Sequence, residues 1–317
     1  MKELNYEKVF NTLVEETANY VTSNGLKAMV LGISGGIDST VVAAICHEVS
    51  KKTGIPLIGR SLPIKNKSDE FDVSKLVGEA FCDEFKVFNL SSSYKSVLFD
   101  LCADAGLIKD CKGYDWYWVS DLEELAGRTP IANGNIQARC RMIHLYDIAS
   151  IRKGLVMSTD NQTEYQLGFW TIHGDVGDFD PIQDLWKTEV YELAKWIYNY
   201  YFTKYSVEVT YDNRESVAEY AKMLDAIKQS SALTPTDGLG ISNSDLEQIG
   251  AKSYYDVDRV LRTLICKASP ENDKLQDSLE RELGAEVINK IIKRHKASEF
   301  KRKKAPIYIA REKYEND

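Results

Sequence analysis

The stretch from residue 28 to residue 45 constrains the fold of this chain more than any other. Residues 28–33 form an apolar run that is typical of a short buried strand. A Ser-Gly-Gly turn follows at 34–36, and the apolar spacing of residues 41–45 predicts a helix. A glycine turn between a strand and a helix lets backbone N–H groups converge where the helix dipole favours an anion. The stretch therefore predicts an α/β fold with a phosphate-binding turn.

This turn is not of the Walker type, because no Gly-Lys-Ser/Thr follows the glycines. A simpler interpretation is a helix start rich in small residues, capped by Asp38 or Ser39. The order Ser-Gly-Gly-x-Asp-Ser, however, resembles the loop of enzymes that split ATP into AMP and pyrophosphate. By that resemblance Asp38 would bind magnesium, and the loop as a whole would bind ATP through Gly32, Ile33, Ser34, Gly35, Gly36, Ile37, Asp38 and Ser39.

The size and composition of the chain are those of one globular domain. Its 317 residues can bury a sizeable core, and 44% hydrophobic with 28% charged residues is ordinary for a soluble fold. The net charge of -8 argues against a nucleic-acid coat protein, so we expect no nucleic-acid partner. We expect a single domain over residues 1–317.

Neither a membrane span nor a signal peptide is expected. The N-terminus carries an amphipathic helical pattern over residues 4–22 but no long apolar segment. The cysteines are scattered without a Cys-x-x-Cys pair, which is typical of reduced thiols: Cys46, Cys82, Cys102, Cys111, Cys140 and Cys266. We therefore expect a cytoplasmic protein.

Strand-like and helix-like segments alternate after the first helix. The expected strands are 28–33, 56–61 and 85–90, and the helices between them are 38–52 and 69–84. Such alternation favours a doubly wound parallel sheet flanked by helices. Ligands of these sheets bind at the carboxyl ends of the strands, which is where Ser34 falls.

Residues 91–132 break this alternation, and residues 204–230 are polar and mostly helical. The first of these segments contains an aromatic cluster at 112–119, which suits a lid over a flat ligand, a subunit contact or a satellite core. Near the C-terminus, residues 293–304 contain seven Lys and Arg residues. They suit a phosphate-rich ligand or a solvated basic tail equally well.

A second set of polar residues follows another strand end. Residues 155–159 predict a buried strand, so Thr159 and Glu164 should arrive at the edge of the sheet that carries Ser34. A carboxylate at Glu164 could complete a magnesium site with Asp38, because magnesium prefers oxygen ligands. The alternative for Glu164 is simple charge complementarity with a helix N-terminus.

Two further features are weaker taken alone. Residues 168–181 hold three glycines, a proline and four Asp or His groups, which is typical of a functional loop. His173 could act there as a general base, but a single loop histidine is more often incidental. Upstream, Arg139 is a planar cation suited to a phosphate or carboxylate, and it shares a helix face with Asn135.

Several separated blocks together resemble the NAD synthetase family. They are Ser34-Gly-Gly-Ile-Asp-Ser39, Asn135-Ile-Gln-Ala-Arg139 with Arg141-Met142, Ser158-Thr-Asp-Asn-x-x-Glu164, and Gly174-Asp175 with Pro181 and Lys187. The match continues through 185–193, 234–236, 254–258 and 298–302. The resemblance covers nearly the whole chain apart from the segments near residues 106–130 and 204–230, which look like helical insertions into the family fold. The loop alone occurs in many ATP pyrophosphatases, but the order of the other blocks is more selective.

The resemblance implies a two-step amide synthesis on an adenine nucleotide alpha-hydrolase-like fold. The nicotinate carboxylate of deamido-NAD attacks the α-phosphorus of ATP, which forms an acyl-adenylate and releases pyrophosphate. Ammonia then attacks the activated carbonyl and gives NAD and AMP. Such chemistry needs positioning and stabilisation of the leaving charge more than covalent catalysis by the protein.

The resemblance also implies roles for individual residues. Thr159, Lys187 and Thr236 would bind ATP, and Asp38 with Glu164 would hold Mg2+. Arg139, Asp178 and Lys301 would bind deamido-NAD at a site that lies across a homodimer interface. The expected catalytic residues are Asp38, Lys187 and Asp175. The role of Asp175, to orient or deprotonate ammonia, is inferred only from its position in the loop at 168–181.

The chain departs from the family pattern at two places. The family usually has a lysine where this chain has Ile172, and a histidine where it has Phe300. Both departures concern the dinucleotide contacts rather than the ATP chemistry. His173 or one of the extra lysines of the tail would be able to compensate.

Other functions remain compatible with parts of the sequence. One is another ATP pyrophosphatase, of the tRNA-modifying or GMP-synthetase-like kind, and another is a sensor that binds ATP without chemistry. The acidic balance disfavours the first, and the pair Asp38 and Glu164 disfavours the second. Because only one helix precedes the strand at 28–33, we expect no glutaminase domain there, and free ammonia as the nitrogen donor.

Overall fold

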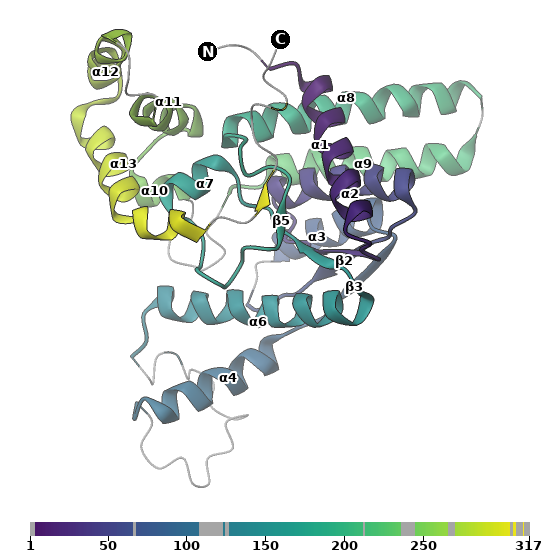
Figure 1. Ribbon diagram of the computed structural model, residues 1–317, viewed down its shortest axis with the longest axis horizontal. Coiled ribbons are helices and arrows are strands. Elements are labelled where there is room, and N and C mark those ends of the chain that lie inside the picture. Colours follow the sequence, from purple (N-terminus) through teal and green to yellow (C-terminus); the bar gives the residue numbers. More distant parts are fainter. Residues whose placement is uncertain are drawn as a thin grey trace.

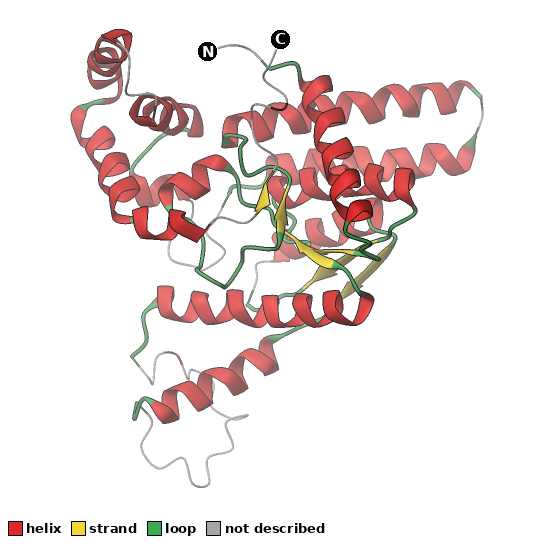
Figure 2. Cartoon of the chain, viewed as in Figure 1, coloured by secondary structure: helices red, strands yellow, loops and turns green. Residues whose placement is uncertain are grey.

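The computed structural model describes residues 4–65, 68–107, 123, 127–211, 213–235, 245–265, 270–304, 307–308 and 313. Its centre is a parallel sheet with the strand order β3-β2-β1-β4-β5-β6. The strands are β1 (Met29–Gly32), β2 (Leu57–Ser61), β3 (Glu84–Val87), β4 (Leu155–Met157), β5 (Phe179–Asp180) and β6 (Ile307–Tyr308). The predicted doubly wound parallel sheet is confirmed (Figure 2).

Helices cover both faces of this sheet (Figure 1). One face carries α1 (Tyr6–Ser23), α2 (Ile37–Thr53), α3 (Ser68–Phe81), α8 (Lys187–Thr210) and α9 (Arg214–Ala232). The other face carries α4 (Ser91–Asp104) and α6 (Pro130–Arg152). Among the described residues, no helix is both long and apolar enough to cross a membrane.

A third group of helices lies beside the sheet and has its own apolar cluster. It consists of α7 (Gln162–Leu167), α10 (Asp245–Ile249), α11 (Tyr254–Ile265), α12 (Pro270–Leu283), α13 (Ala285–Ala297) and the 3-10 helix η2 (Glu299–Lys304). We call this group the C-terminal helical cluster. Leu167 and Trp186 join its apolar core, so the cluster packs directly against the start of α8.

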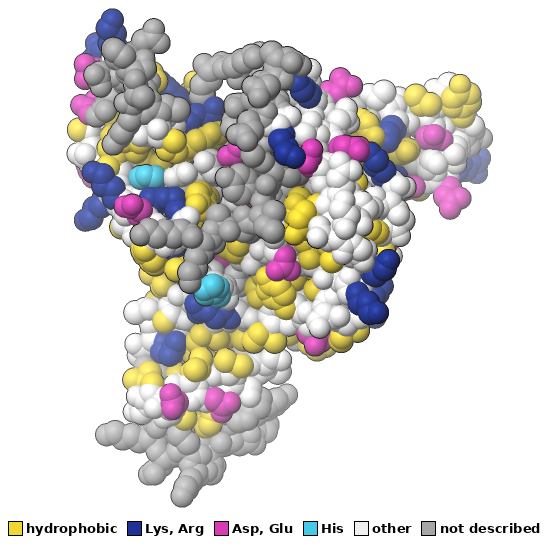
Figure 3. All heavy atoms as spheres, in the orientation of Figure 1, with side chains coloured by type: hydrophobic (Ala, Val, Ile, Leu, Met, Phe, Trp, Pro, Cys, Tyr) yellow, Lys and Arg dark blue, Asp and Glu magenta, His cyan; other side chains and the backbone are white. Residues whose placement is uncertain are grey.

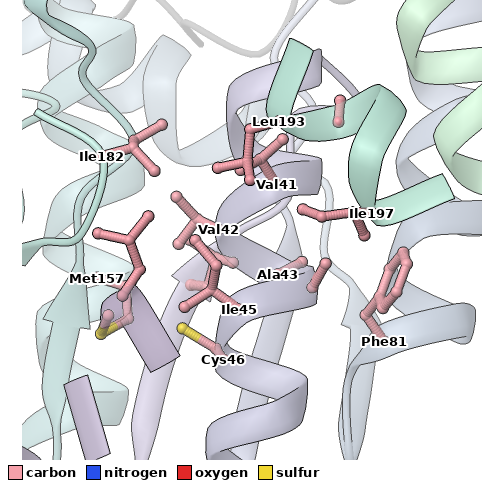
Figure 4. Close-up of a cluster of buried hydrophobic side chains, with 14 of the residues drawn as sticks. Val41, Val42, Ala43, Ile45, Cys46, Phe81, Met157, Ile182, Leu193 and Ile197 are labelled. Carbon is pink, nitrogen blue, oxygen red and sulfur yellow. The ribbon is translucent and has the colours of Figure 1, made fainter. Parts of the chain in front are cut away.

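The main core surrounds α2, which follows the predicted phosphate-binding turn. Figure 4 shows Val42, Ile45 and Cys46 of α2 pointing toward Met157 and Ile182, while Val41 faces Leu193 of α8. Because α2 is buried along most of its length, its apolar residues do not alternate with polar ones as on a surface helix. This burial fixes the first turn of α2, and with it the turn that precedes the helix.

The two expected insertions lie differently in the structure. Residues 204–230 belong to an antiparallel helix pair, because α8 runs on to Thr210 and α9 returns along it (Figure 1). Most of 106–130, with the aromatic cluster at 112–119, lies outside the described residues. The assignment of both segments as insertions stays a prediction.

Candidate active site

The site lies where the winding of the sheet reverses direction. β1 pairs with β2 on one side and with β4 on the other, so the loops after β1 and β4 leave the same edge side by side. This is the position at which parallel sheets bind ligands. The loop after β1 contains Ser34, and the loop after β4 leads from Thr159 to Glu164. The sequence-based expectation for these loops agrees with the fold.

The turn after β1 requires glycine. Gly35 has a φ of 89°, and a Cβ atom there would lie 2.7 Å from the backbone oxygen of Glu70 on α3. A side chain at this position would therefore be strained and would also clash with backbone. The hydroxyls of Ser34 and Ser39 are 3.0 Å apart, and the N–H of Gly36 donates to Ser34 Oγ at 3.2 Å. Small polar groups thus gather at the N-terminus of α2, where an anion is favoured.

Three of the predicted residues meet beside this turn. The ammonium group of Lys187, at the start of α8, forms ion pairs with Asp38 of α2 and, at 3.0 Å, with Glu164 of α7. The side chain of Lys187 is only 2% exposed, whereas the two carboxylates are partly exposed to the cavity. Burial alone would lower the pKa of Lys187, but the two carboxylates raise it well above its ordinary value. Lys187 is therefore a fixed cation within the site.

Asn161 orients the acidic groups, a role that the sequence did not predict. Its side-chain oxygen accepts from the N–H of Glu164 at 3.0 Å, as the N-cap of α7. Its side-chain nitrogen donates to Asp38 Oδ1 at 2.8 Å. One amide thus links the first turn of α7 to the first turn of α2. The capping pattern Asn-x-x-Glu is visible in the sequence, but the contact with Asp38 depends on the fold.

A cavity of about 330 Å³ opens over these groups. This volume is within the range of small-molecule sites. The loop after β1, Asp38, Thr159, Glu164 and Lys187 line one part of it. Arg60 and Arg141 line another part, and neither was predicted as a site residue. Arg60 forms an ion pair with Glu84 at 2.6 Å, and this contact fixes the guanidinium of Arg60. Residue type alone does not reveal such a contact.

Asp175 also faces the cavity. Although the cavity makes it accessible, the carboxyl lies deep among protein atoms, and this burial raises the pKa of Asp175 to about 6. The N–H of Thr171, which donates to Asp175 Oδ1 at 2.7 Å, and the nearby charges of Lys301 and Arg139 limit the rise. A carboxyl with such a pKa can act as a base near neutral pH.

Two other carboxyls in this region are closed off from solvent. Asp160 lies in the loop after β4, and Asp180 is the last residue of β5. The side chains of both are almost completely buried. Burial raises the pKa of both groups, and the neighbouring Asp175 raises that of Asp160 further. Burial therefore favours the neutral, protonated form of both carboxyls, and neither of them lines the cavity.

The residues predicted for deamido-NAD are not gathered in the cavity. Asp178 accepts hydrogen bonds from the N–H of Val156 at 3.0 Å and from the hydroxyl of Tyr146 at 3.1 Å. Lys301 donates to the carbonyl oxygens of Gly168, at 2.7 Å, and of Trp170. All these partners belong to the chain itself.

The remaining predicted positions are placed as follows. Arg139 is exposed on α6 and donates to the carbonyl oxygen of Ile172 at 3.0 Å. Phe300 is 63% exposed. Thr159 lines the cavity, whereas Thr236 lies outside the described residues. His173 is exposed in a left-handed backbone conformation with a φ of 54°, and it does not line the cavity.

The donor set fits a magnesium ion bound with a polyphosphate. Asp38 and Glu164 offer carboxylate oxygens on one side of the cavity, and both already bind the same cation, Lys187. Within the described part of the chain, no group of three or more His, Cys, Asp or Glu residues could hold a metal ion. Magnesium usually takes one or two protein carboxylates and completes its shell with phosphates and waters, so two carboxylates suffice.

The fold and this site define a nucleotide-binding α/β protein of the kind that binds phosphates at a strand–turn–helix junction. The sequence profile of the NAD synthase family matches residues 9–305. The chain therefore belongs to the NAD synthase family.

Individual relatives agree with this assignment. The chain is 31% identical over 280 residues to an NH(3)-dependent NAD(+) synthetase of Thermoplasma acidophilum, covering 87% of this chain and 88% of the relative. An NMN synthetase of Francisella tularensis has a similar fold, with a TM-score of 0.66 and 23% identity over 96% of this chain and 98% of that one. An NH3-dependent NAD synthetase of Campylobacter jejuni also has a similar fold. Its TM-score is 0.60, and its sequence is 22% identical, over 97% of this chain and 100% of that one.

Proposed function

We propose that this protein is an ammonia-dependent NAD synthetase. It would convert deamido-NAD, ATP and ammonia into NAD, AMP and pyrophosphate through an acyl-adenylate. The proposal rests on membership of the NAD synthase family and on one observation above all, the buried Lys187 held between Asp38 and Glu164 beside the phosphate-binding turn. A protein that only binds ATP has less use for this arrangement of one cation and two carboxylates at the phosphates.

In the first step, the loop residues 34–39 and Lys187 would hold the β- and γ-phosphates of ATP. The leaving pyrophosphate accumulates negative charge, so fixed N–H donors and a fixed cation stabilise the transition state. Asp38 and Glu164 would hold Mg2+ against the same phosphates. When bound, the metal neutralises the charge of the leaving group and orients it.

In the second step, Asp175 would orient ammonia or accept its proton. Its position at the cavity wall and its raised pKa of about 6 support this role. Ammonia must lose a proton after it attacks the activated carbonyl, and a carboxylate is ready to accept one above pH 6. Arg139 and Lys301, whose charges act on Asp175, would bind deamido-NAD next to it.

We further propose a homodimer with α6 at its interface. Ile143 and Ile151 of α6 are 68% and 71% exposed, and with Tyr146 they form an apolar stripe on one side of the helix. Helical spacing places Arg139 on the same side. Figure 3 shows hydrophobic side chains exposed over the lower part of the molecule, where α6 and α4 lie. A second copy packed on this face would bring its own residues close to the proposed dinucleotide site.

A cytoplasmic location is part of the proposal. The four cysteines within the described residues are free thiols, as expected in a reducing compartment: Cys46, Cys82, Cys102 and Cys140. Three of them are buried, so exposure to solvent does not threaten them with oxidation.

The decisive experiment is a reconstituted assay. The purified protein is incubated with ATP, Mg2+, ammonium and deamido-NAD, and AMP and NAD are quantified by chromatography. We expect both products in equal amounts, and neither when deamido-NAD is omitted. A parallel incubation with nicotinate mononucleotide tests the shorter acceptor. Formation of no AMP with either acceptor would refute the proposed function, whereas turnover of the mononucleotide alone would correct the acceptor.

A further inference from the structure

One side of α11 meets three consecutive residues at the start of α8. Tyr254, Asp258 and Arg262 are four residues apart, so they form one stripe along the helix. We call it the α11 stripe. The ring centroid of Tyr254 lies 5.5 Å from the Nζ of Lys187. Arg262 and Glu189 form an ion pair at 2.6 Å.

Asp258 is the centre of the stripe. Its Oδ2 accepts from the backbone N–H of Thr188 at 3.0 Å and from the hydroxyl of the same residue at 2.7 Å. Its Oδ1 accepts from the hydroxyl of Thr163, on α7, at 2.5 Å. The oxygen of Thr163 in turn accepts from the backbone N–H of Lys187 at 2.9 Å. One carboxylate thus ties α11 to the first turns of both α7 and α8.

These bonds replace a cap that α8 lacks. The residue before the helix is Trp186, whose indole offers no hydrogen-bond acceptor, so it cannot bind the first free N–H groups of the helix. Instead, the backbone N–H of Lys187 donates to Thr163 of α7, and the backbone N–H of Thr188 donates to Asp258 of α11. The start of α8, with the backbone of Lys187, is therefore positioned by α7 and α11 rather than by a cap of its own.

The same bonds lie next to the groups that form the site. Thr163 precedes Glu164, and Thr188 follows Lys187. Building on the proposed function, we propose that Asp258 is a positioning residue that holds the first turns of α7 and α8 in register, so that Glu164 and Lys187 both face Asp38. Through it α11 contributes to the active site without lining the cavity.

The burial of Asp258 supports a role beyond packing. The residue is 2% exposed, and burial raises its pKa to about 6 in spite of the hydrogen bonds from Thr163 and Thr188. A carboxylate is costly to bury even when it is hydrogen-bonded, and an apolar residue would pack α11 at lower cost. What an apolar residue could not do is accept three hydrogen bonds from the starts of two different helices.

The test compares Asp258→Asn with a matched control on the same helix, Leu261→Ala. Leu261 is completely buried in the cluster, so its truncation should destabilise the protein without touching the hydrogen bonds at the starts of α7 and α8. Asparagine keeps the size of Asp258 but cannot accept on both sides, so the hydroxyl of Thr163 loses its acceptor. Both variants are measured well below their melting temperatures.

The first measurement does not depend on activity. The amine of Lys187 is labelled with an acylating reagent and the modification is quantified by mass spectrometry. We expect labelling to be about tenfold faster in Asp258→Asn than in the wild type, because the amine is no longer held between its carboxylates, and unchanged in Leu261→Ala. Labelling no faster in Asp258→Asn than in Leu261→Ala would overturn the proposal.

The second measurement is turnover. We expect Asp258→Asn to lower kcat by about 10- to 100-fold with the KM for ATP nearly unchanged, because small displacements of catalytic groups cost this much. Leu261→Ala should keep its kcat. Thr163→Val should lower kcat as well, and the double variant should lose less than the sum of the two. A kcat within twofold of the wild type in Asp258→Asn would also overturn the proposal, whereas a wild type without activity would refute only the proposed function.

Discussion

The two halves of the site are built differently. In the half beside the phosphate-binding turn, three residues from α2, α7 and α8 form one ion-paired group, and the predicted Asp38, Glu164 and Lys187 are all in it. In the half predicted to bind the dinucleotide, Arg139, Asp178 and Lys301 each bind other parts of the same chain. The ion-paired group of the first half thus forms within a single chain.

The difference follows from how each half is positioned. The groups of the first half stand in the first turns of helices at the carboxyl edge of one parallel sheet, so sequence motifs predict their meeting. The groups of the second half lie on the outer side of α6, in the loop around residues 168–178 and in the 3-10 helix η2. Their contacts depend on packing between distant segments, and in our proposal on a second copy of the chain.

Replacement of Lys187 should have the largest effect. In Lys187→Met we expect kcat to fall by about 1000-fold, because a fixed cation at the leaving phosphates is lost and two carboxylates are left facing each other. The matched control is Lys195→Met, on the same helix, whose side chain is 73% exposed. AMP formation measures both. Turnover of Lys187→Met within tenfold of the control would contradict the role of the first half.

Replacement of one acidic group should have the next largest effect. We expect Asp38→Asn and Glu164→Gln each to lower pyrophosphate release by about 100-fold and to raise the magnesium concentration needed for half-maximal rate. Glu192→Gln, on the exposed side of α8, serves as the control. If either variant kept a near-normal rate at ordinary magnesium concentrations, the assignment of Asp38 and Glu164 as magnesium ligands would be contradicted.

Replacement of Arg139 or Lys301 tests the half of the site that is predicted to bind the dinucleotide. We expect Arg139→Ala and Lys301→Ala to raise the KM for deamido-NAD by about tenfold and to leave the KM for ATP nearly unchanged, since each removes a cation near Asp175. Steady-state kinetics with each substrate varied in turn measures both values. An equal loss for ATP would show that the two halves are not separate.

Asp178 should behave differently from these two cations. Its carboxylate binds a β4 backbone N–H and the hydroxyl of Tyr146, so we expect Asp178→Ala to lower the free energy of unfolding by about 1–3 kcal/mol. The KM for deamido-NAD should change less than in Arg139→Ala. Urea unfolding and kinetics on the same preparation decide this. A raised KM with unchanged stability would restore the predicted role in substrate binding.

The smallest expected effect concerns pH. Burial raises the pKa of Asp258 from 3.8 to about 6, so between these values the folded state binds more protons than the unfolded state. The contribution of this group to stability is therefore fully present below pH 3.8 and is lost as the pH rises through 6. Asp258→Asn should reduce the fall in unfolding free energy between pH 4 and pH 6.5. Urea unfolding across this range measures it, and an identical slope in both proteins would contradict the raised pKa.

The sequence alone predicted the strand–turn–helix at residues 28–45, the alternation that gives a parallel sheet, and the family. These are consequences of local pattern, because the apolar spacing, the glycine turn and the helix caps act over a few residues. The family resemblance also predicted that Asp38, Glu164 and Lys187 belong to one site, and the position of Glu164 after a strand end independently favoured its meeting with Asp38. Thr236 and the aromatic cluster at 112–119 lie outside the described residues, and their roles stay predictions.

Only the tertiary structure placed Asn161 between two helices, Arg60 beside the cavity, and Asp258 under the starts of α7 and α8. Asp258 is nearly 100 residues away from Thr163, and no local pattern links them. A hydrogen bond needs two groups within about 3 Å, and that condition depends on the packing of whole helices. The sequence determined which chemical groups are present near the phosphates, and the packing of the helices decided which residues position them.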